Sequence, residues 1–433
     1  MTRTTSHSHR FDPTDIVDIG GIGFGPSNLG LAIAVSELDE PQMTPLTARF
    51  VERQATFSWH PGMLLPRTTM QISFLKDLAT QRNVQSRFTF LNYLAHRGRL
   101  IDFINHQTFF PSRHEFHDYL EWAAQFVDAD VLYGTSAIDV EVEDDHFAVH
   151  LDGRYPGVLR ARNLVVSTGL SARLPDGVCA SRRVFHNHRL LTHLEDMPPQ
   201  QHNRFAVIGA GQSAAEVVEY LHTTYPDAEV HAVFAKYGYT PADDSPYANR
   251  VFDPSAVDDF HSATPEFRRR LLGYHRATNY SAVDLPLIEE LYGREYAERV
   301  SGQRRLFMHG ASDLAGIAET PAGVDVTVSH GPTGLTEVLS CDAVVCATGF
   351  HQMNLRSSLG GLADHVVTDP EGPRVNRDYR VEMNRELPGG IYLQGGTEHT
   401  HGLSSSLLSN VAVRSGEIVR RIARDRVATP ARD

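Results

Sequence analysis

A glycine-rich stretch near the start of the chain is the first feature that indicates a specific chemistry. A β-branched run at residues 15–19 leads into a cluster of glycines at residues 20–25, and small residues follow from residue 26. Glycines let a backbone turn tightly and approach a pyrophosphate, and the free N–H groups at the start of the next helix bind phosphates. This strand–turn–helix order is typical of the first unit of a dinucleotide-binding fold, with Asn28 in place of the third glycine.

A second stretch repeats this pattern roughly 190 residues later. Residues 205–208 form a short apolar run, Gly209 and Gly211 open a G-x-G-x-x-A turn, and a helical pattern follows. One such turn could belong to an ordinary α/β domain. Two turns at this separation favour two nucleotide-binding domains.

The residue that closes the next strand differs between the two units. Glu52 closes the strand-like residues 49–52 in the first unit, and an acid at this position binds a ribose hydroxyl. Lys236 follows the strand-like residues 229–234 in the second unit, where a cation tolerates a 2′-phosphate. We therefore expect NADPH rather than NADH in the second unit. The alternative is that Lys236 is a solvated surface lysine.

The composition limits the classes of function. With 433 residues, 41% of them hydrophobic, the chain has room for two or three domains with sizeable cores. A net charge of −13 argues against a nucleic-acid partner, and no apolar run reaches the ~18 residues of a membrane-spanning helix. Residues 1–12 are expected to be disordered and lack the apolar core of a signal peptide. Three cysteines fit a reducing compartment, so a cytoplasmic location is expected.

Three groups of residues suggest a redox or metal chemistry that their sequence context argues against. Cys341 and Cys346 could form a redox disulfide, but the residues between them read as one strand. That strand would hold the thiols too far apart and on opposite faces. His114 and His117 lie three positions apart without a third ligand, so no zinc site is expected there. The run Glu398-His399-Thr400-His401 is likewise not expected to bind a metal.

The order of the patterns predicts an α/β protein with two dinucleotide-binding, Rossmann-like domains. Helices are expected at 88–96 and 115–126, and a hairpin-rich stretch within 131–166. The strand-like residues 343–347 resemble 165–169, and such strands mark the crossings between domains in two-dinucleotide flavoproteins. We therefore expect the second dinucleotide-binding domain to be inserted in the first. The predicted ranges are 1–12 for the disordered N-terminus, 13–200 for the first part of the first domain, 201–345 for the second domain, and 346–433 for the return of the first domain with a C-terminal helix.

Several blocks resemble, in order and over residues 15–422, the flavin-dependent N-hydroxylating monooxygenases of bacteria and fungi. Within that family the chain is most similar to the L-ornithine N5-monooxygenases of actinobacterial natural-product and siderophore pathways, and less similar to the lysine N6-monooxygenases. The combination is specific, although each block alone is not. The blocks are Trp59-His60-Pro61-Gly62-Met63, Met70-Gln71-Ile72-Ser73-Phe74-Leu75-Lys76-Asp77-Leu78, Phe109-Phe110-Pro111-Ser112-Arg113, Gly211-Gln212-Ser213-Ala214-Ala215-Glu216, Asp244-Ser245-Pro246-Tyr247-Ala248-Asn249, Thr278-Asn279-Tyr280-Ser281, Ala347-Thr348-Gly349-Phe350 and His401-Gly402-Leu403-Ser404.

The resemblance implies an enzyme that holds FAD in the first domain and NADPH in the second, so that an NADPH domain is inserted in an FAD domain. It also implies a small substrate-binding region, at 240–300 within the NADPH domain. NADPH would reduce the flavin, O2 would form a flavin C4a-hydroperoxide, and one oxygen atom would pass to the side-chain amine of L-ornithine. The product, N5-hydroxy-L-ornithine, would enter a siderophore or another natural product. Because the cofactor carries the difficult step, no nucleophilic side chain and no metal are expected. A homo-oligomer, a tetramer in many relatives, is expected.

The resemblance also implies roles for individual residues. Lys76 would bind the substrate carboxylate, Asn249 and Asn279 would lie near its amines, and Ser404 would close the pocket, while Asn279 and Gln71 would position the reacting groups. Taken singly, Lys76 would be interpreted as a surface lysine and the asparagines as turn residues; their occurrence in one ordered set favours ligands. The residues implied for FAD are Gly21, Gly23, Gly25, Pro26, Asn28, Glu52, Trp59, His60, Gln71, His401, Gly402 and Leu403. Those implied for NADPH are Gly209, Gly211, Gln212, Ser213, Lys236, Asn279, Tyr280 and Ser281.

The chain departs from the family pattern at two places, and alternatives stay open. Many relatives carry an arginine near Ala235-Lys236, and many read Gly-Leu-Ser-Asp where this chain has Gly402-Leu403-Ser404-Ser405. The alternatives are a hydroxylase of L-lysine or another diamine, a Baeyer–Villiger or general flavin monooxygenase, and a flavin-binding regulatory protein without turnover. The last two fit less well, because the linker signature of those monooxygenases is absent and the second glycine-rich turn is intact.

Overall fold

The first of two large sheets combines parallel and antiparallel strands. The structure, a computed structural model, describes residues 15–38 and 45–428, so the predicted disordered residues 1–12 lie outside the described residues. The strands of this sheet are β1 (Ile16–Ile22), β2 (Ala48–Glu52), β3 (Asp130–Tyr133), β4 (Thr135–Val142), β5 (Phe147–Gly153), β6 (Gly157–Val166) and β19 (Ile391–Leu393). Their order is β3-β2-β1-β6-β5-β4, and β19 pairs with the end of β6. Strands β3, β2, β1, β6 and β19 are parallel, whereas β4, β5 and β6 form an antiparallel meander.

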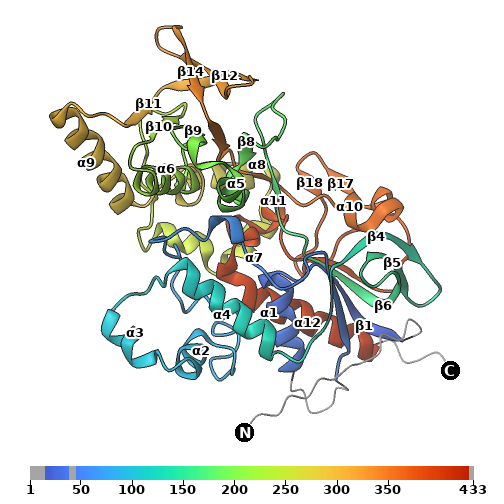
Figure 1. The fold of residues 1–433 in the computed structure, drawn as a ribbon. Coiled ribbons are helices and arrows are strands. Elements are labelled where there is room, and N and C mark those ends of the chain that lie inside the picture. Colours follow the sequence, from blue (N-terminus) through green and yellow to red (C-terminus); the bar gives the residue numbers. More distant parts are fainter. Residues whose placement is uncertain (1–14, 39–44, 429–433) are drawn as a thin grey trace.

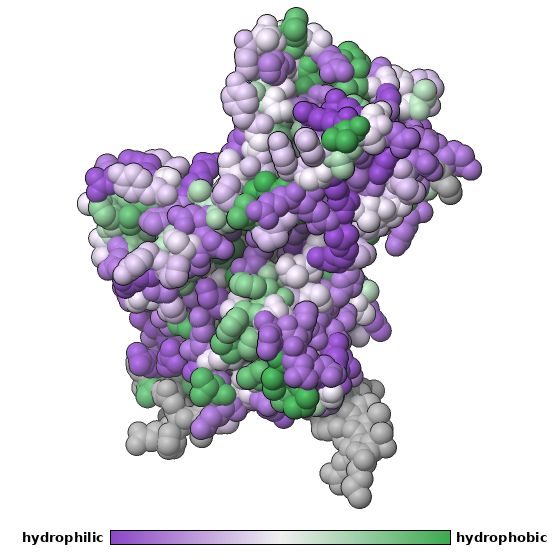
Figure 2. Space-filling view, turned by 90° about the vertical axis from the view of Figure 1, so that its left-hand side faces the viewer, coloured by the Kyte–Doolittle hydropathy of each residue, from purple (hydrophilic) through white to green (hydrophobic). Residues whose placement is uncertain are grey.

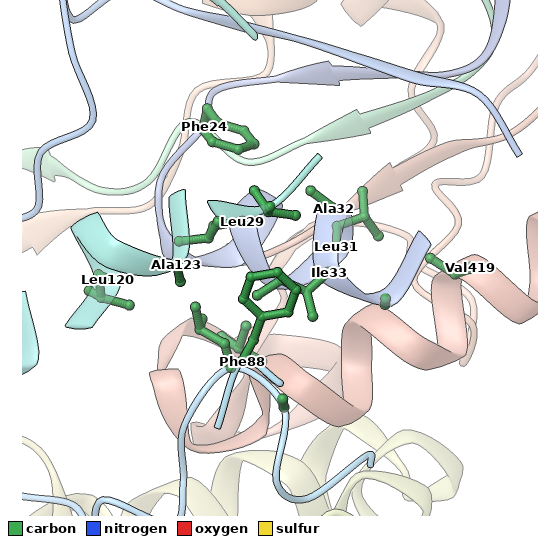
Figure 3. Close-up of a cluster of buried hydrophobic side chains, with 14 of the residues drawn as sticks. Phe24, Leu29, Leu31, Ala32, Ile33, Phe88, Leu120, Ala123 and Val419 are labelled. Atoms are coloured by element: carbon green, nitrogen blue, oxygen red, sulfur yellow. The ribbon is translucent and has the colours of Figure 1, made fainter. Parts of the chain in front are cut away.

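Helices α1 (Pro26–Ser36) and α12 (Val411–Ala428) lie side by side next to this sheet (Figure 1). Gly30 permits their close approach, because a Cβ there would come within 2.7 Å of a Val411 methyl group. Figure 3 shows part of the buried apolar cluster around α1, to which α12 contributes Val419. The other helices of this part are α2 (Phe90–His96), α3 (Leu100–His106), α4 (Arg113–Phe126), α10 (Arg356–Leu359) and α11 (Glu398–His401).

The helices predicted from apolar spacing are present as α2 and α4, whereas α3 was not predicted. Helix α4 begins at Arg113, before the predicted start, because the hydroxyl of Ser112 accepts the N–H of Glu115 and caps the first turn. Among the described residues, no helix combines the length and the apolar character that a membrane crossing needs.

The second large sheet is parallel throughout. Its order is β11-β10-β9-β15-β8, and a separate antiparallel sheet, β12-β13-β14, follows β11 in the chain. The core cluster beside the parallel sheet includes the buried face of α6. The strands are β8 (Val184–His186), β9 (Arg204–Ile208), β10 (Glu229–Val233), β11 (Leu306–His309), β12 (Ser312–Glu319), β13 (Val324–His330), β14 (Thr336–Cys341) and β15 (Ala343–Cys346); the helices are α5 (Leu190–Asp196), α6 (Gln212–Thr224), α7 (Ala256–Ser262), α8 (Pro265–Tyr274) and α9 (Leu285–Ser301).

The second sheet is inserted into the first part of the fold through two adjacent crossings. Strands β7 (Ser171–Ala172) and β16 (Phe350–His351) pair antiparallel where the chain leaves and returns. The predicted fold class, two Rossmann-like domains with the second inserted in the first, is confirmed. The predicted range 13–200 includes β8, which belongs to the second sheet.

The remaining short elements are β17 (Thr368–Asp369), β18 (Gly372–Pro373), η1 (Pro61–Met63), η2 (Asn187–Arg189), η3 (Pro199–Gln201), η4 (Ala248–Phe252), η5 (Arg276–Thr278), η6 (Gly360–His365), η7 (Leu403–Ser406) and η8 (Leu408–Asn410).

Cys341 and Cys346 are both free, as expected, but for a different geometric reason. The prediction of one continuous strand with the thiols on opposite faces was wrong. Cys341 ends β14 and Cys346 ends β15, and the chain passes from one sheet to the other at Asp342. Both thiols consequently lie in the same buried apolar cluster. Burial raises the pKa of each thiol to about 12.

Candidate dinucleotide and substrate sites

The first glycine of each turn is required by the protein's own backbone. Gly23 has a φ of +86°, and a Cβ there would lie 2.4 Å from the carbonyl oxygen of Ser167. Gly209 has a φ of +144°, and a Cβ there would lie 2.3 Å from the carbonyl oxygen of Ala347. A side chain at either position would therefore clash with the neighbouring strand connection.

The second glycine of each turn faces open space. A Cβ on Gly25 would meet no heavy atom within 4 Å, and a Cβ on Gly211 would meet only the backbone of Ser281, at 3.6 Å. These glycines are the N-caps of α1 and α6, and neither helix start has a side-chain cap. Free N–H groups and open space at a helix N-terminus are what a pyrophosphate needs. The residues present therefore fit a dinucleotide at both turns.

Polar side chains hold the first turn in place. Glu52 accepts the N–H of Phe24 at 2.7 Å, so the acid that ends β2 binds the glycine-rich turn directly. Asn28 is fully buried and donates to the carbonyl oxygen of Gly23 at 2.7 Å. Gly21 faces the ring of Phe50, where a Cβ would come within 2.1 Å. Sequence reasoning assigned Glu52 to a ribose hydroxyl and Gly21 and Asn28 to FAD; the structure places all three side by side at the turn, where the oxygens of Glu52 accept backbone N–H groups.

The other residues implied for FAD lie on connections of the first part. Pro26 is the first residue of α1, and the rings of Trp59 and His60 are 5.0 Å apart before η1. His401 is buried, stacks on Tyr379 at 4.4 Å, and has a pKa lowered to about 3 by burial, so it is neutral at physiological pH. The next two residues, Gly402 and Leu403, are buried as well.

Three residues predicted for NADPH meet at the second turn. The ammonium group of Lys236 donates to the carbonyl oxygen of Ser281 at 2.6 Å and to the hydroxyl of Thr240 at 2.7 Å. Ser281 in turn is the neighbour of Gly211. Gln212 and Ser213 are the first two residues of α6. Lys236 is therefore held beside the turn by two neutral oxygens.

Asp284, which sequence reasoning missed, connects the two predicted cofactor regions. Its carboxylate accepts the amide of Gln212 at 3.1 Å and the amide of Gln71 at 3.4 Å. Gln71 comes from the first part of the chain and Gln212 from the inserted part, so Asp284 bridges them. Burial raises the pKa of Asp284, and the two amides oppose that shift. A lone aspartate before a helix gives no sequence signal for such a role.

A bidentate ion pair joins the two parts close by. The guanidinium of Arg113 donates to both oxygens of Glu216, at 2.9 and 2.8 Å. Glu216 is buried in α6, and Arg113 begins α4. A bidentate, largely buried pair fixes orientation as well as distance. Both residues occur in the sequence blocks quoted above, but the blocks do not indicate that they pair.

Lys76 lies beside element η4, which in turn contacts η7. Its ammonium group lies 5.8 Å from the ring centroid of Phe252, which ends η4, the element that also contains Asn249. Element η4 contacts η7, which contains the buried Ser404. Burial lowers the pKa of Lys76, and the negative charge of Asp253 opposes this. No carboxylate among the described residues lies within ion-pair distance of Lys76.

The structure does not bring Asn279 into contact with this group. Asn279 is exposed, and its N–H donates to the carbonyl oxygen of Arg276. The next residue, Tyr280, donates its hydroxyl to Glu398, which was not predicted. Asn249 donates to the carbonyl oxygen of Asp244 at 2.8 Å. No group of three ligating side chains suited to a metal lies within residues 15–38 and 45–428.

The fold and the two glycine-rich turns define a two-domain dinucleotide-binding protein with one domain inserted in the other. Comparison with known proteins identifies the family. The family model described as L-lysine 6-monooxygenase/L-ornithine 5-monooxygenase matches residues 15–352. The chain belongs to this family.

Individual relatives agree with this assignment. The L-ornithine N(5)-oxygenase of Arthrobotrys oligospora is 41% identical, over 94% of this chain and 88% of the relative. The solved ornithine N-hydroxylase of Kutzneria sp. 744, described with reduced FAD, NADP+ and L-ornithine, is 46% identical with a TM-score of 0.91, over 95% of this chain and 100% of that one. The L-lysine 6-monooxygenase of Pseudomonas syringae is 33% identical with a TM-score of 0.81, over 94% of this chain and 99% of that one.

Proposed function

We propose that this chain is an L-ornithine N5-monooxygenase that uses FAD and NADPH. The reaction consumes one L-ornithine, one O2, one NADPH and one proton, and gives N5-hydroxy-L-ornithine, NADP+ and water. Bound FAD supplies the electron transfer and the oxygen activation, as cofactors do in such enzymes. The relatives named for ornithine, at 41% and 46% identity, support ornithine over lysine as the substrate.

The observation that carries the proposal is the environment of Lys76. A half-buried ammonium group without a carboxylate partner among the described residues is costly unless a ligand supplies the anion. The carboxylate of an amino acid is such an anion. Asn249 lies on η4, next to Lys76, and Ser404 lies on η7, which contacts η4; both would offer neutral groups to the remainder of the substrate. Lys76 would thus set the orientation in which the side-chain amine points away from the carboxylate.

The two glycine-rich turns then bind different cofactors. FAD binds at Gly25 and α1, where Glu52 and Asn28 shape the turn, and NADPH binds at Gly211 and α6. We propose that Lys236 binds the 2′-phosphate of NADPH, that Gln71 approaches the flavin, and that Asn279 positions the amine. Tyr280 and Ser281 line the nicotinamide side, and residues 401–403 line the flavin.

The test compares two amines that differ by a carboxylate. Lys76→Ala should lower kcat/KM for L-ornithine hydroxylation by roughly 30-fold or more, because a buried charge pair is lost. Putrescine lacks the carboxylate, so its weak turnover should hardly change. The measurement is the yield of hydroxylamine and of peroxide with each amine, with Arg87→Ala as a matched loss of charge elsewhere on the first part. L-lysine and cadaverine in the same assay test the alternative substrates.

Retention of FAD and of flavin reduction by NADPH in Lys76→Ala shows that the fold is intact. The expected phenotype is consumption of NADPH with release of peroxide and little hydroxyornithine. Near wild-type hydroxylation of ornithine by this variant would contradict the carboxylate role. Faster hydroxylation of L-lysine than of L-ornithine by the wild-type protein would overturn the substrate assignment in favour of the lysine enzyme.

We also propose that the chain assembles as a homotetramer and works in the cytoplasm. Apolar side chains on and near α3, namely Ile101, Ile104, Phe109 and Phe110, are exposed and support self-association. Figure 2 shows hydrophobic residues gathered on the lower part of this face. Free cysteines at 179, 341 and 346 support a reducing compartment. Light scattering of the purified protein tests the oligomer, and a monomer at micromolar concentration would refute it.

A further inference from the structure

Arg414 on α12 is a fully buried guanidinium with neutral partners. Its Nε donates to the side-chain oxygen of Gln394 at 3.2 Å, and its two terminal nitrogens donate to the carbonyl oxygen of Ser405 at 2.7 Å and to the hydroxyl of Ser27 at 3.5 Å. The nearest acid along the helix, Glu417, is already held by Arg377 through two bonds of 3.0 and 3.1 Å. No carboxylate of the described residues lies within ion-pair distance of Arg414.

Such a charge is expensive to bury. Removing a guanidinium from water costs several kcal/mol unless an anion compensates it. Burial lowers the pKa of Arg414, yet an arginine stays protonated in proteins, so the group cannot escape the cost by losing its proton. The three neutral acceptors satisfy its hydrogen bonds, and the charge of Glu417, which is paired with Arg377, offsets the cost of burial only in part. An anion bound beside this site would therefore stabilise the buried charge further.

The surroundings of Arg414 indicate where that anion binds. Ser27 lies in the first turn of α1, directly after Gly25 and Pro26, where the structure leaves open space. The amide of Gln394 donates to the carbonyl oxygen of Ser27 at 3.0 Å, so Gln394 and Arg414 together support this turn from behind. The contact between α1 and α12 that carries this arrangement is visible in Figures 1 and 3.

The donor geometry also sets the direction of the Ser27 hydroxyl. A guanidinium has only donors, so the oxygen of Ser27 must accept from Arg414. The proton of Ser27 is then free to point to an anion at the open side of the turn. Gln394 is fixed in the same way, since its oxygen accepts from Arg414 and its nitrogen must face Ser27.

We infer that Arg414 is a positioning residue for FAD, whose pyrophosphate supplies the anion that Arg414 lacks. The inference rests on the proposed binding of FAD at the first turn. Arg414 acts through the charge it places behind α1 and through the hydroxyl of Ser27. It thus adds a positive charge to a phosphate site that otherwise relies on backbone N–H groups and the helix dipole.

The test measures ligand affinity and apoprotein stability together. Arg414→Met removes the charge at similar length, Arg414→Lys keeps the charge without the fork, and Arg420→Met changes an exposed arginine of the same helix as a matched control. We expect Arg414→Met to weaken FAD binding by tenfold or more, Arg414→Lys by less, and Arg420→Met by less than twofold. Urea unfolding of the Arg414→Met apoprotein should show no loss of stability, because an uncompensated buried charge has been removed.

ADP carries the same pyrophosphate without the flavin. Its binding therefore tests whether the anion that stabilises Arg414 is the pyrophosphate or another part of FAD. Arg414→Met should weaken ADP binding by about the same factor as FAD binding. A loss for FAD without a loss for ADP would overturn the pyrophosphate assignment. Unchanged FAD affinity with an equal loss of stability in apo and FAD-loaded protein would show a merely structural role. Failure of the wild-type protein to bind FAD would instead contradict the proposed function.

Ser27→Ala provides a second route if Arg414→Met does not fold. This variant should weaken FAD binding several-fold, and the same substitution should have a smaller effect in the Arg414→Lys background, because the two residues act as one unit. Additive effects on the free energy of FAD binding would contradict the proposed relay through the Ser27 hydroxyl.

Discussion

The two glycine-rich turns share a backbone and differ in the side chains around it. In the first, the N–H of Ser167 donates to Ile22 at 2.8 Å, and in the second the N–H of Ala347 donates to Ile208 at 2.8 Å. The position of the third glycine holds the buried amide Asn28 in one turn and the fully buried Ala214 in the other. After the first turn, strand β2 ends in Glu52, whose carboxylate binds that turn. After the second turn, strand β10 is followed by Lys236.

This comparison separates what the fold requires from what a ligand requires. The first glycine of each turn is dictated by a carbonyl oxygen of the neighbouring connection, so it would be needed without any cofactor. The second glycine of each turn faces open space instead, and Lys236 lies beside the second turn. Changes at these positions should alter ligand binding while leaving the fold intact.

The largest expected effect comes from a side chain at the second glycine of each turn. Gly25→Val should yield protein without bound FAD, whereas Gly211→Val should keep FAD and lose NADPH, each by 100-fold or more in affinity, because a branched side chain occupies the phosphate space. The measurement is flavin absorbance of the purified protein and the rate of flavin reduction at rising NADPH.

Gly293→Val, on the exposed face of α9, is the control for a valine that faces open space. By contrast, Gly23→Ala should destabilise the apoprotein itself, since its φ and the nearby carbonyl oxygen leave no room for a Cβ. A flavin-loaded Gly25→Val protein would end the assignment of FAD to the first turn.

Removal of the positive charge of Lys236, which follows β10, should have an intermediate effect. Lys236→Ala should raise KM for NADPH about tenfold and KM for NADH much less, because only NADPH carries the 2′-phosphate. Lys236→Arg should retain most of the preference. Steady-state flavin reduction with both nucleotides measures this, and equal changes for the two would remove Lys236 as the phosphate ligand.

The smallest effect concerns acid stability, in which the two sheets also differ. Strand β8 of the second sheet carries the buried His186, whose ring bonds the carbonyl oxygen of Gly349 at 2.7 Å. The strands of the first sheet contain one histidine, His150 in β5, which is half-buried rather than buried. Burial lowers the pKa of His186 to about 4, so between its unfolded pKa near 6.5 and pH 4 the unfolded chain binds a proton that the folded chain does not.

The free energy of unfolding should therefore fall as the pH decreases through this window. His186→Asn keeps a donor for Gly349 but cannot be protonated, and it should remove about 1 kcal/mol of the loss between pH 7 and 5.5. Urea unfolding of both proteins at several pH values measures this difference. An unchanged pH dependence in the variant would show that the folded protein does not lower the pKa of His186.

The glycine turns, their strands and the residue after each next strand could be predicted from the sequence, because these features are local and periodic. The contacts between distant segments could not. Asp284 bridges Gln71 and Gln212, and Arg113 pairs with Glu216, only because the inserted domain packs where it does. Strand β8 was not predicted at all, because a strand of three residues has too short a pattern to be recognised in the sequence.

Lys76 and Lys236 have one more property in common: they are the only two lysines among the 433 residues. Amine-directed chemistry on this protein is consequently restricted to these two side chains and the α-amino group of the chain. Reductive methylation with 13C-labelled formaldehyde would place one NMR reporter in the proposed substrate pocket and one beside the proposed NADPH phosphate. Occupancy of the two sites could then be followed separately, at equilibrium and without turnover, in a single spectrum.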